Sequence, residues 1–189
     1  MMDDNFIKYM LFIALISGCL VGGLILIILK LKKRNTKTSK VKYDEINGGS
    51  VSAFFDKGNN ITIIPYVKDK FGVGRATTNS LPLGYPYTPE KLGQALRASM
   101  NSCISGIPST DKELMASLKY NSWNEFSQGK RNISVHFQDG YGIVFNTTIR
   151  RYDGSYQFNY TGFDRIAKSD ATNKELGEML LNLLPRCRS

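Results

Sequence analysis

The residues of this sequence that could do chemistry are few, with one His and three Cys in 189 residues. A zinc site needs three or four converging nitrogen or sulfur ligands. His136, Cys103 and Cys187 lack the spacing of such ligands, and Cys19 lies in an apolar run. A nucleophilic site would place a Ser or Cys and an orienting acid beside His136. Because apolar and polar residues alternate in "ISVHFQD", an exposed strand residue is the simpler interpretation of His136. The sequence predicts no metal and no cofactor.

Two further patterns could bind phosphate or transfer protons. The segment "FGVGR" at 71–75 resembles part of a Gly-rich phosphate loop, but it lacks the Gly-Lys-Ser/Thr ending and does not open a helix. Glycines of a twisted strand explain it better. The aspartates that could serve as acid or base occupy turn-like positions, where Asp is usually solvated: Asp69, Asp139, Asp153 and Asp164. Because no acid–base pair can be nominated, we predict that the protein is not an enzyme.

Large amphipathic side chains outside the apolar stripes are candidates for binding a protein partner. Tyr, Trp and Arg carry most of the binding energy at protein interfaces, because they bury much area at small entropic cost. The candidates are Tyr85, Tyr87, Trp123, Tyr141, Arg150, Arg151, Tyr152 and Tyr156. Ordinary residues of a solvated sheet are the alternative interpretation. From Ser50 onward the net charge is +5, with 17 Lys and Arg against 12 Asp and Glu. This charge is mild and no RNA-binding signature accompanies it, so we expect no nucleic-acid partner.

The elements that must position these side chains include two hairpins. The β-branched run "ITIIPYV" at 61–67 is followed, after a charged turn, by "FGVGRATTNS". In the second half, "NISVHFQDGYGIVFNTTI" alternates apolar and polar residues on both sides of Asp139-Gly140, which is a strong signal for a two-residue turn. The segment "SYQFNYTGF" predicts one further strand. We therefore expect a twisted antiparallel sheet of about six strands.

Two longer segments begin as capped helices. Thr88 is a favourable N-cap, and Pro89 suits the first helical position. Thr172 and Glu175 form a capping box, and an apolar stripe follows each start. With helices packed on an antiparallel sheet, the predicted fold class is α+β.

The two helix starts also resemble each other. "TPEKLGQAL" and "TNKELGEML" match at Thr, Leu-Gly and Leu. This match predicts two diverged copies of one β-β-α unit, at 58–101 and 131–184. Ile61 and Ile133 are taken as matching strand starts, with an insertion in the second copy. Between the copies we expect a structured linker with a short helix capped at 122–125.

An uncharged apolar run occupies residues 9–29. At about 1.5 Å per residue it is long enough for the hydrocarbon core of a bilayer, about 30 Å thick. A cleaved signal peptide is the alternative, but acidic residues precede the run and no cleavage site ends it. We predict a single N-terminal transmembrane anchor at 1–30. Gly18 and Gly22 form a G-x-x-x-G pair, a weak signal for dimerisation.

Charge on the two sides of the run sets its orientation. One basic residue, Lys8, precedes the run, whereas seven follow it: Lys30, Lys32, Lys33, Arg34, Lys37, Lys40 and Lys42. By the positive-inside rule the chain after the run is cytoplasmic. We therefore expect a protein of the bacterial inner membrane with its N-terminus outside, a basic juxtamembrane tether at 31–50 and a cytoplasmic domain at 51–189.

Several of these segments together resemble the immunity proteins of bacterial contact-dependent growth inhibition systems. The resemblance covers about residues 52–184. It is carried by "ITIIPYV", by the helix start "YTPEKLG", by "SWNEF" and by the closing helix "NKELGEMLLNLL".

This resemblance implies a binding protein rather than an enzyme. Immunity proteins of these systems bind the toxin domain that a neighbouring cell delivers, and they block its active site or its access to substrate. The resemblance assigns no individual contact residue. It implies a membrane-anchored inhibitor that neutralises a cognate toxin by stoichiometric occlusion. A membrane-anchored scaffold or assembly factor without a toxin partner is the alternative from another class, and an enzyme with an unrecognised site is a third.

Overall fold

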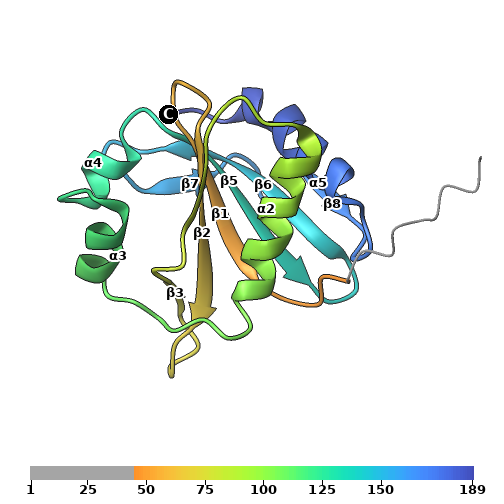
Figure 1. Cartoon of the computed structure of the whole chain (residues 1–189), viewed down its shortest axis with the longest axis horizontal. Coiled ribbons are helices and arrows are strands. Elements are labelled where there is room, and N and C mark those ends of the chain that lie inside the picture. Colours follow the sequence, from red (N-terminus) through yellow and green to blue (C-terminus); the bar gives the residue numbers. More distant parts are fainter. Residues whose placement is uncertain (1–44) are drawn as a thin grey trace, which may run out of the picture. The chain divides into compact units, whose positions relative to one another are not determined.

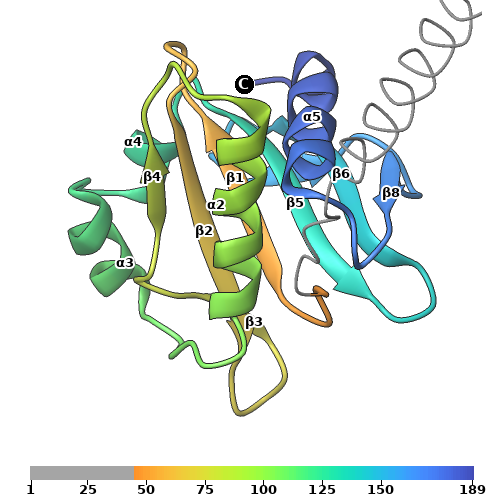
Figure 2. The same ribbon diagram turned by 45° about the vertical axis from the view of Figure 1, so that its right-hand side comes forward.

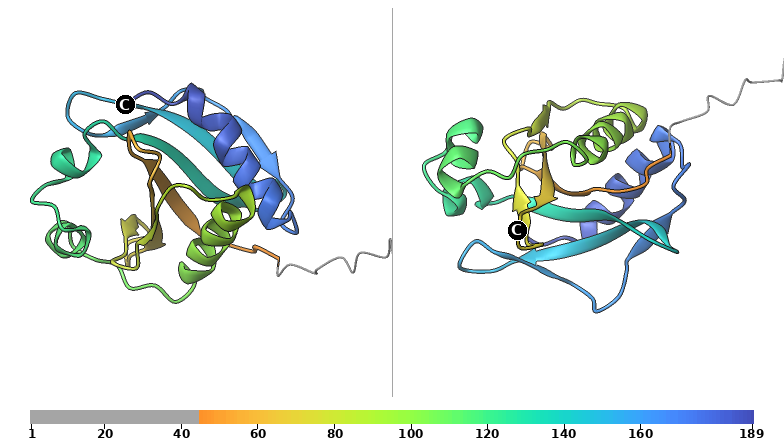
Figure 3. Two further views of the ribbon diagram at one scale, coloured as in Figure 1. Left: turned by 45° about the horizontal axis from the view of Figure 1, so that its top comes forward. Right: turned by 90° about the horizontal axis from the view of Figure 1, so that it is seen from below.

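The computed structural model describes residues 45–189, which form a mixed α+β fold (Figure 1). In this part of the chain one curled antiparallel sheet carries four α-helices, and Figure 3 shows the curl of the sheet. The strands are β1 (Ser50–Phe55), β2 (Ile61–Lys68), β3 (Gly74–Ala76), β4 (Leu81–Leu83), β5 (Arg131–Gln138), β6 (Gly142–Arg150), β7 (Tyr156–Phe158) and β8 (Arg165–Ala167). The helices are α2 (Pro89–Ser102), α3 (Asp111–Leu118), α4 (Trp123–Ser127) and α5 (Asn173–Leu183), followed by the 3-10 helix η1 (Leu184–Arg186).

The sheet has the order β3-β2-β1-β5-β6-β7. β4 shares the outer edge of β2 with β3, and β8 shares the outer edge of β6 with β7. β1 and β5 lie at the centre and run antiparallel, with Ser52 directly opposite Ser134. The sheet is therefore continuous across its middle.

The chain on either side of this centre repeats one order of elements. β1–β4 with α2 form the first half, and β5–β8 with α5 form the second half. In the first half β4 pairs with 61–63 and β3 with 66–68. In the second half β8 pairs with 143–145 and β7 with 148–150. The segments of β2 that pair with β4 and β3 are thus spaced as are the segments of β6 that pair with β8 and β7. An approximate two-fold axis at the Ser52–Ser134 pair therefore relates the two halves.

This arrangement changes the alignment used for the two predicted copies. The counterpart of Ile61 by pairing is Ile143, whereas the sequence pattern had matched Ile61 with Ile133. β5 corresponds instead to β1, a strand that the sequence analysis did not recognise. The predicted tether also ends earlier than residue 50, because Ile46 is fully buried in the core. That the halves descend from one unit stays a prediction.

The face of the sheet that carries α2 and α5, the helix face, holds the larger core. Ala53, Phe55, Ile63, Val135 and Phe145 point into it from the central strands. As predicted, α5 buries Leu176, Leu180 and Leu183. Thr88 and Thr172 cap the two helices, and the Thr172–Glu175 capping box is complete. Within the described residues, the members of this core run from Ile46 to Cys187.

The two helices of this face lie side by side (Figure 2), and one glycine of each helix forms their contact. A Cβ atom on Gly93 would lie 1.7 Å from the carbonyl oxygen of Asn173. A Cβ atom on Gly177 would lie 1.9 Å from the carbonyl oxygen of Pro89. Each glycine therefore packs against the first residue of the other helix. The matching Leu-Gly pairs in the sequence are explained by this contact, which no larger residue permits.

On the opposite face of the sheet, the helices of the described chain cover the first half and leave the second half open (Figure 1). Phe54 and Ile64 of the sheet pack there against Leu114 and Met115 of α3 and Phe126 of α4. Both helices come from residues 103–130, the segment that joins the two halves. The linker thus adds a second, smaller core to the first half.

These observations confirm the predicted α+β class and antiparallel sheet, although the described part has eight strands instead of about six. β4 and β8 are short and β1 follows a Gly-rich segment, so none gave a clear alternating pattern. The predicted spanning run at 9–29 and the Gly18/Gly22 pair lie outside the described residues. Among residues 45–189, no helix combines the length and apolar character needed to cross a bilayer.

Candidate protein-binding surface

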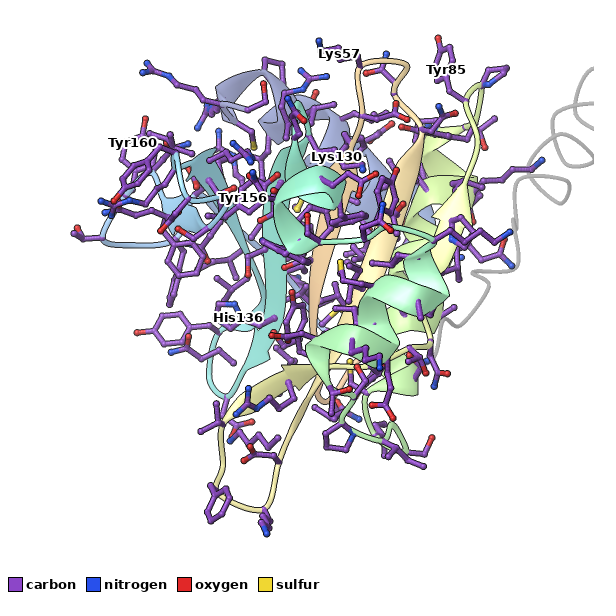
Figure 4. The ribbon with its side chains drawn as sticks, turned by 90° about the vertical axis from the view of Figure 1, so that its left-hand side faces the viewer. Lys57, Tyr85, Lys130, His136, Tyr156 and Tyr160 are labelled. Carbon is purple, nitrogen blue, oxygen red and sulfur yellow. The ribbon has the colours of Figure 1, made fainter. Side chains whose placement is uncertain are left out.

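Over the second half, the opposite face of the sheet exposes large apolar side chains. They lie on β7, on β8, in the loop between them and at the β5–β6 turn. We call this set the open surface, and it consists of Tyr141, Phe158, Tyr160, Phe163 and Ile166. Figure 4 shows Tyr160 and His136 on the part of the sheet that α3 and α4 leave uncovered. This is the side chain composition that protein interfaces favour at their centres.

The loop that carries Tyr160 and Phe163 is fixed to β6. The Asn146 Nδ2 donates to the carbonyl oxygen of Gly162 at 2.7 Å. The Asp164 carboxylate accepts hydrogen bonds from the backbone N–H and the hydroxyl of Thr147, at 2.7 and 2.8 Å. Exposed aromatic side chains on a held loop lose little conformational entropy when they bind a partner.

Aromatic contacts also order the ring of Phe163. It stands edge-to-face with Tyr141, at 5.4 Å between centroids, and with His136, at 6.2 Å. His136 is half-buried on β5 beneath this ring. It therefore serves here as part of the floor of the open surface, in keeping with the strand interpretation.

Three of the sequence-predicted binding residues hold the two halves together. The Trp123 indole N–H donates to the carbonyl oxygen of Gly154 at 2.9 Å, and its ring meets the edge of Phe54. The Tyr156 hydroxyl lies 3.0 and 2.9 Å from the carbonyl oxygens of Ser127 and Lys130. Burial raises the pKa of Tyr156 to about 12. These contacts fasten α4 to the β6–β7 hairpin.

Arg150 also connects the β6–β7 hairpin to α4. Its guanidinium donates to the Ser127 hydroxyl at 3.2 Å and to the side-chain oxygen of Asn124. The next two candidates, Arg151 and Tyr152, are exposed. The guanidinium of Arg151 donates to the side-chain oxygen of Gln157 at 2.9 Å. Tyr152 is 92% exposed at the β6–β7 turn.

The remaining two predicted tyrosines lie at a different place, beside the β1–β2 turn. The Tyr87 hydroxyl donates to the carbonyl oxygen of Asn59 at 2.8 Å, which ties the start of α2 to this turn. Tyr85 is exposed and stands edge-to-face with Tyr87 at 5.7 Å. The eight candidates thus fall into separate groups, and only Tyr141 belongs to the open surface. Their role in binding stays a prediction.

Sequence reasoning missed Phe158, Tyr160, Phe163 and Ile166. Phe158 and Tyr160 were read as part of one strand in "SYQFNYTGF", but β7 ends at Phe158 and the rest is loop. The density of aromatic residues after a short strand was the available signal.

A surface pocket lies on the first half and is lined by residues of α3, of α4 and of the segment between them. This surface pocket has a volume of about 510 Å³ and includes Leu114, Met115, Tyr120 and Trp123 in its lining. Its floor is the smaller core, so its apolar character follows from the packing that joins these helices to the sheet.

Groups suited to covalent or metal chemistry are sparse in the described chain. Cys103 and Cys187 are free thiols, and burial raises the pKa of Cys187, which makes its thiolate less accessible. Within residues 45–189, no three His, Cys, Asp or Glu side chains gather as metal ligands do.

Comparison with known proteins adds evidence on the fold. No protein-family model matches the sequence, and no curated protein matches it. Two solved structures share the fold. A protein of unknown function from Neisseria meningitidis aligns over 78% of this chain and all of its own, with a TM-score of 0.56 and 13% identity. A chain of the CdiA-CT/CdiI toxin and immunity complex from Yersinia pseudotuberculosis aligns over 77% of this chain and all of its own, with a TM-score of 0.53 and 14% identity. At these identities the likeness shows the fold alone.

Proposed function

We propose that this protein is an immunity protein that binds a cognate contact-dependent growth inhibition toxin domain and neutralises it by stoichiometric occlusion. The observation that carries the proposal is an exposed, ordered aromatic surface on a fold shared with a chain of a toxin and immunity complex. The sequence resemblance to immunity proteins supports the same function. The protein has no catalytic role in this proposal.

The open surface is the contact that we assign to the toxin. Five exposed apolar side chains on adjacent elements form the apolar centre that a protein interface needs. Arg165 on β8 and Arg151 on the β6–β7 turn are exposed on neighbouring elements of the second half.

Membrane anchoring is the second part of the proposal. The apolar run at 9–29 holds the protein in the inner membrane with the folded part in the cytoplasm, as the flanking charge predicts. Anchoring raises the effective concentration of the inhibitor where an incoming toxin first reaches the cytoplasm.

The experiment uses the toxin domain encoded beside this protein's gene. Toxin activity is titrated with the full chain and with residues 45–189. Occlusion predicts a linear fall to zero at about one equivalent for nanomolar affinity. Both forms should give the same titration, because the contacts belong to the folded part. If no neighbouring toxin domain binds at micromolar concentration, the proposal is wrong and a scaffold role replaces it.

A matched pair of variants tests the assigned surface. Tyr160 and Tyr85 are both tyrosines and are both 60% exposed, but only Tyr160 lies on the open surface. Tyr160→Ser should weaken toxin binding by about 2 kcal/mol, or about 30-fold, if it is a hot spot. Tyr85→Ser should leave the affinity unchanged. The reverse result would move the contact to the β1–β2 turn.

A further inference from the structure

A second set of exposed apolar side chains lies at the end of the sheet where β1 begins. We call this the proximal end, and the end with the β1–β2 and β6–β7 turns the distal end. Phe71 and Val73 form the tip of the β2–β3 turn, at 78% and 51% exposure. Ile104 and Ile107, in the loop after α2, are 78% and 79% exposed. Figures 1 and 2 show this turn and this loop next to each other at the bottom of the molecule.

Both loops are held in place. The Asp69 carboxylate accepts hydrogen bonds from the backbone N–H groups of Phe71 and Val73, at 2.8 and 3.0 Å, which shapes the tip of the turn. In the other loop, the backbone N–H and hydroxyl of Ser109 both donate to the carbonyl oxygen of Ala76, at 2.9 and 2.8 Å. The apolar side chains therefore project from fixed backbone.

The β2–β3 hairpin carries three basic side chains and one acidic side chain, and Asp111 lies beside Arg75 in the same hollow. Lys68, Lys70 and Arg75 are exposed on the same hairpin. Lys70 Nζ lies 5.0 Å from the centre of the Phe71 ring. The acidic residue of the hairpin, Asp69, accepts hydrogen bonds within the turn. Its carboxylate also lies 3.3 Å from the Nε atom of Arg75. Single apolar side chains that project among Lys and Arg are suited to the headgroup layer of an anionic membrane.

The described part of the chain begins at the proximal end. The first described residues run along the proximal end before β1, where the backbone N–H of Ile46 donates to the carbonyl oxygen of Ser169 at 3.0 Å. Gly49 packs against the carbonyl of Met100, at the end of α2. The described chain therefore enters the fold at the proximal end.

We propose that the proximal end, through Phe71, Val73, Ile104 and Ile107 with the basic residues of the β2–β3 hairpin, contacts an anionic lipid surface. This inference rests on the membrane anchoring in the proposed function. It orients the folded part, because the distal end and the Phe158–Tyr160 part of the open surface then point away from the lipid. A protein partner at the same place is the alternative occupant that the test separates.

The test is flotation of residues 45–189 with vesicles, after circular dichroism has shown that this part folds on its own. Binding is expected to phosphatidylcholine vesicles with about one third phosphatidylglycerol, and to be much weaker with phosphatidylcholine alone. Phe71→Ser should weaken binding about tenfold, and Lys70→Gln about fivefold. Tyr152→Ser, at an exposed aromatic of the distal end, is the matched control and should bind as the unchanged protein does.

The outcomes separate this inference from the proposed function. Equal binding of the unchanged protein and Phe71→Ser to the anionic vesicles, or no binding by either, would overturn the lipid contact. Phe71→Ser should still titrate the toxin at about one equivalent. If Phe71→Ser loses toxin binding instead of vesicle binding, the proximal end is a protein contact. Membrane fractionation of the full chain tests the anchor separately.

Discussion

The two halves of the sheet share one order of strands and one helix, but they differ in what covers the opposite face. In the first half Phe54 lies under α3 and α4 and is 1% exposed. In the second half Phe163 lies over His136 and is 39% exposed, and no helix of residues 45–189 covers it. The difference comes from residues 103–130, which fold back over the first half only. A binding surface can thus arise where a cover is missing, without any special residue type.

The strongest test of this comparison is an alanine at each of the two phenylalanines. Phe54 touches three aromatic rings, with centroids 5.1 to 5.6 Å away. Phe54→Ala should therefore lower the free energy of unfolding by about 4 kcal/mol, as a buried Phe deletion does. Phe163→Ala should lower it by about 1 kcal/mol or less. Urea unfolding of residues 45–189 measures both, and equal losses would contradict the distinction between a covered and an open half.

The next test asks whether the halves are alike on the helix face. Gly93→Ala and Gly177→Ala each place a Cβ atom within 2 Å of a backbone oxygen of the other helix. We expect each to destabilise the protein by about 3 kcal/mol, because backbone cannot move aside cheaply. Gly74→Ala is the control, since its Cβ atom meets nothing within 4 Å. If one of these two alanine variants loses much stability and the other loses none, the two helix starts are not equivalent.

The smallest effect concerns the contact between the linker and the second half. The pKa of Tyr156 is raised to about 12 in the folded protein, against about 10 in the unfolded chain. Because the folded state holds the Tyr156 proton to a higher pH than the unfolded chain does, the raised pKa contributes to the free energy of unfolding. This contribution is fully present below pH 10 and is lost as the pH rises toward 12. Solvent screening of a half-exposed group limits it to about 1 kcal/mol. Stability measured from pH 9 to 12 should fall more steeply for the unchanged protein than for Tyr156→Phe, and parallel curves would contradict this assignment.

Local signals in the sequence predicted much of the fold. The caps at Thr88 and Thr172 place helices by chemistry that acts within a few residues, so they could be predicted without the structure. The turn at Asp139-Gly140 was also predicted, but it contains residues 139–141 instead of two residues, because Gln138 pairs with Gly142. β1 could not be predicted, because Phe54 and Phe55 are buried on opposite faces and leave no alternation. The pairing of β1 with β5 depends on contacts about 80 residues apart in the chain.

The candidate site was harder to predict for a related reason. Tyr152 and Tyr156 are the same residue type four positions apart, yet one is fully exposed and the other fastens α4 to the sheet. Which tyrosines remain free depends on where residues 103–130 fold back, and no local pattern encodes that. The open surface is therefore a property of tertiary structure, whereas the helix caps are a property of the sequence.

The central place of β1 has a mechanical consequence. The chain enters the fold directly into a strand that is hydrogen-bonded on both sides, to β2 and to β5. If the N-terminus is fixed and a bound partner is pulled from the open surface, the load reaches the fold through β1. Hydrogen bonds on both sides of the strand would then have to shear together instead of opening one after another. Forced unfolding is governed by the unfolding rate, so we expect this attachment to resist tension better than one through an edge strand such as β7.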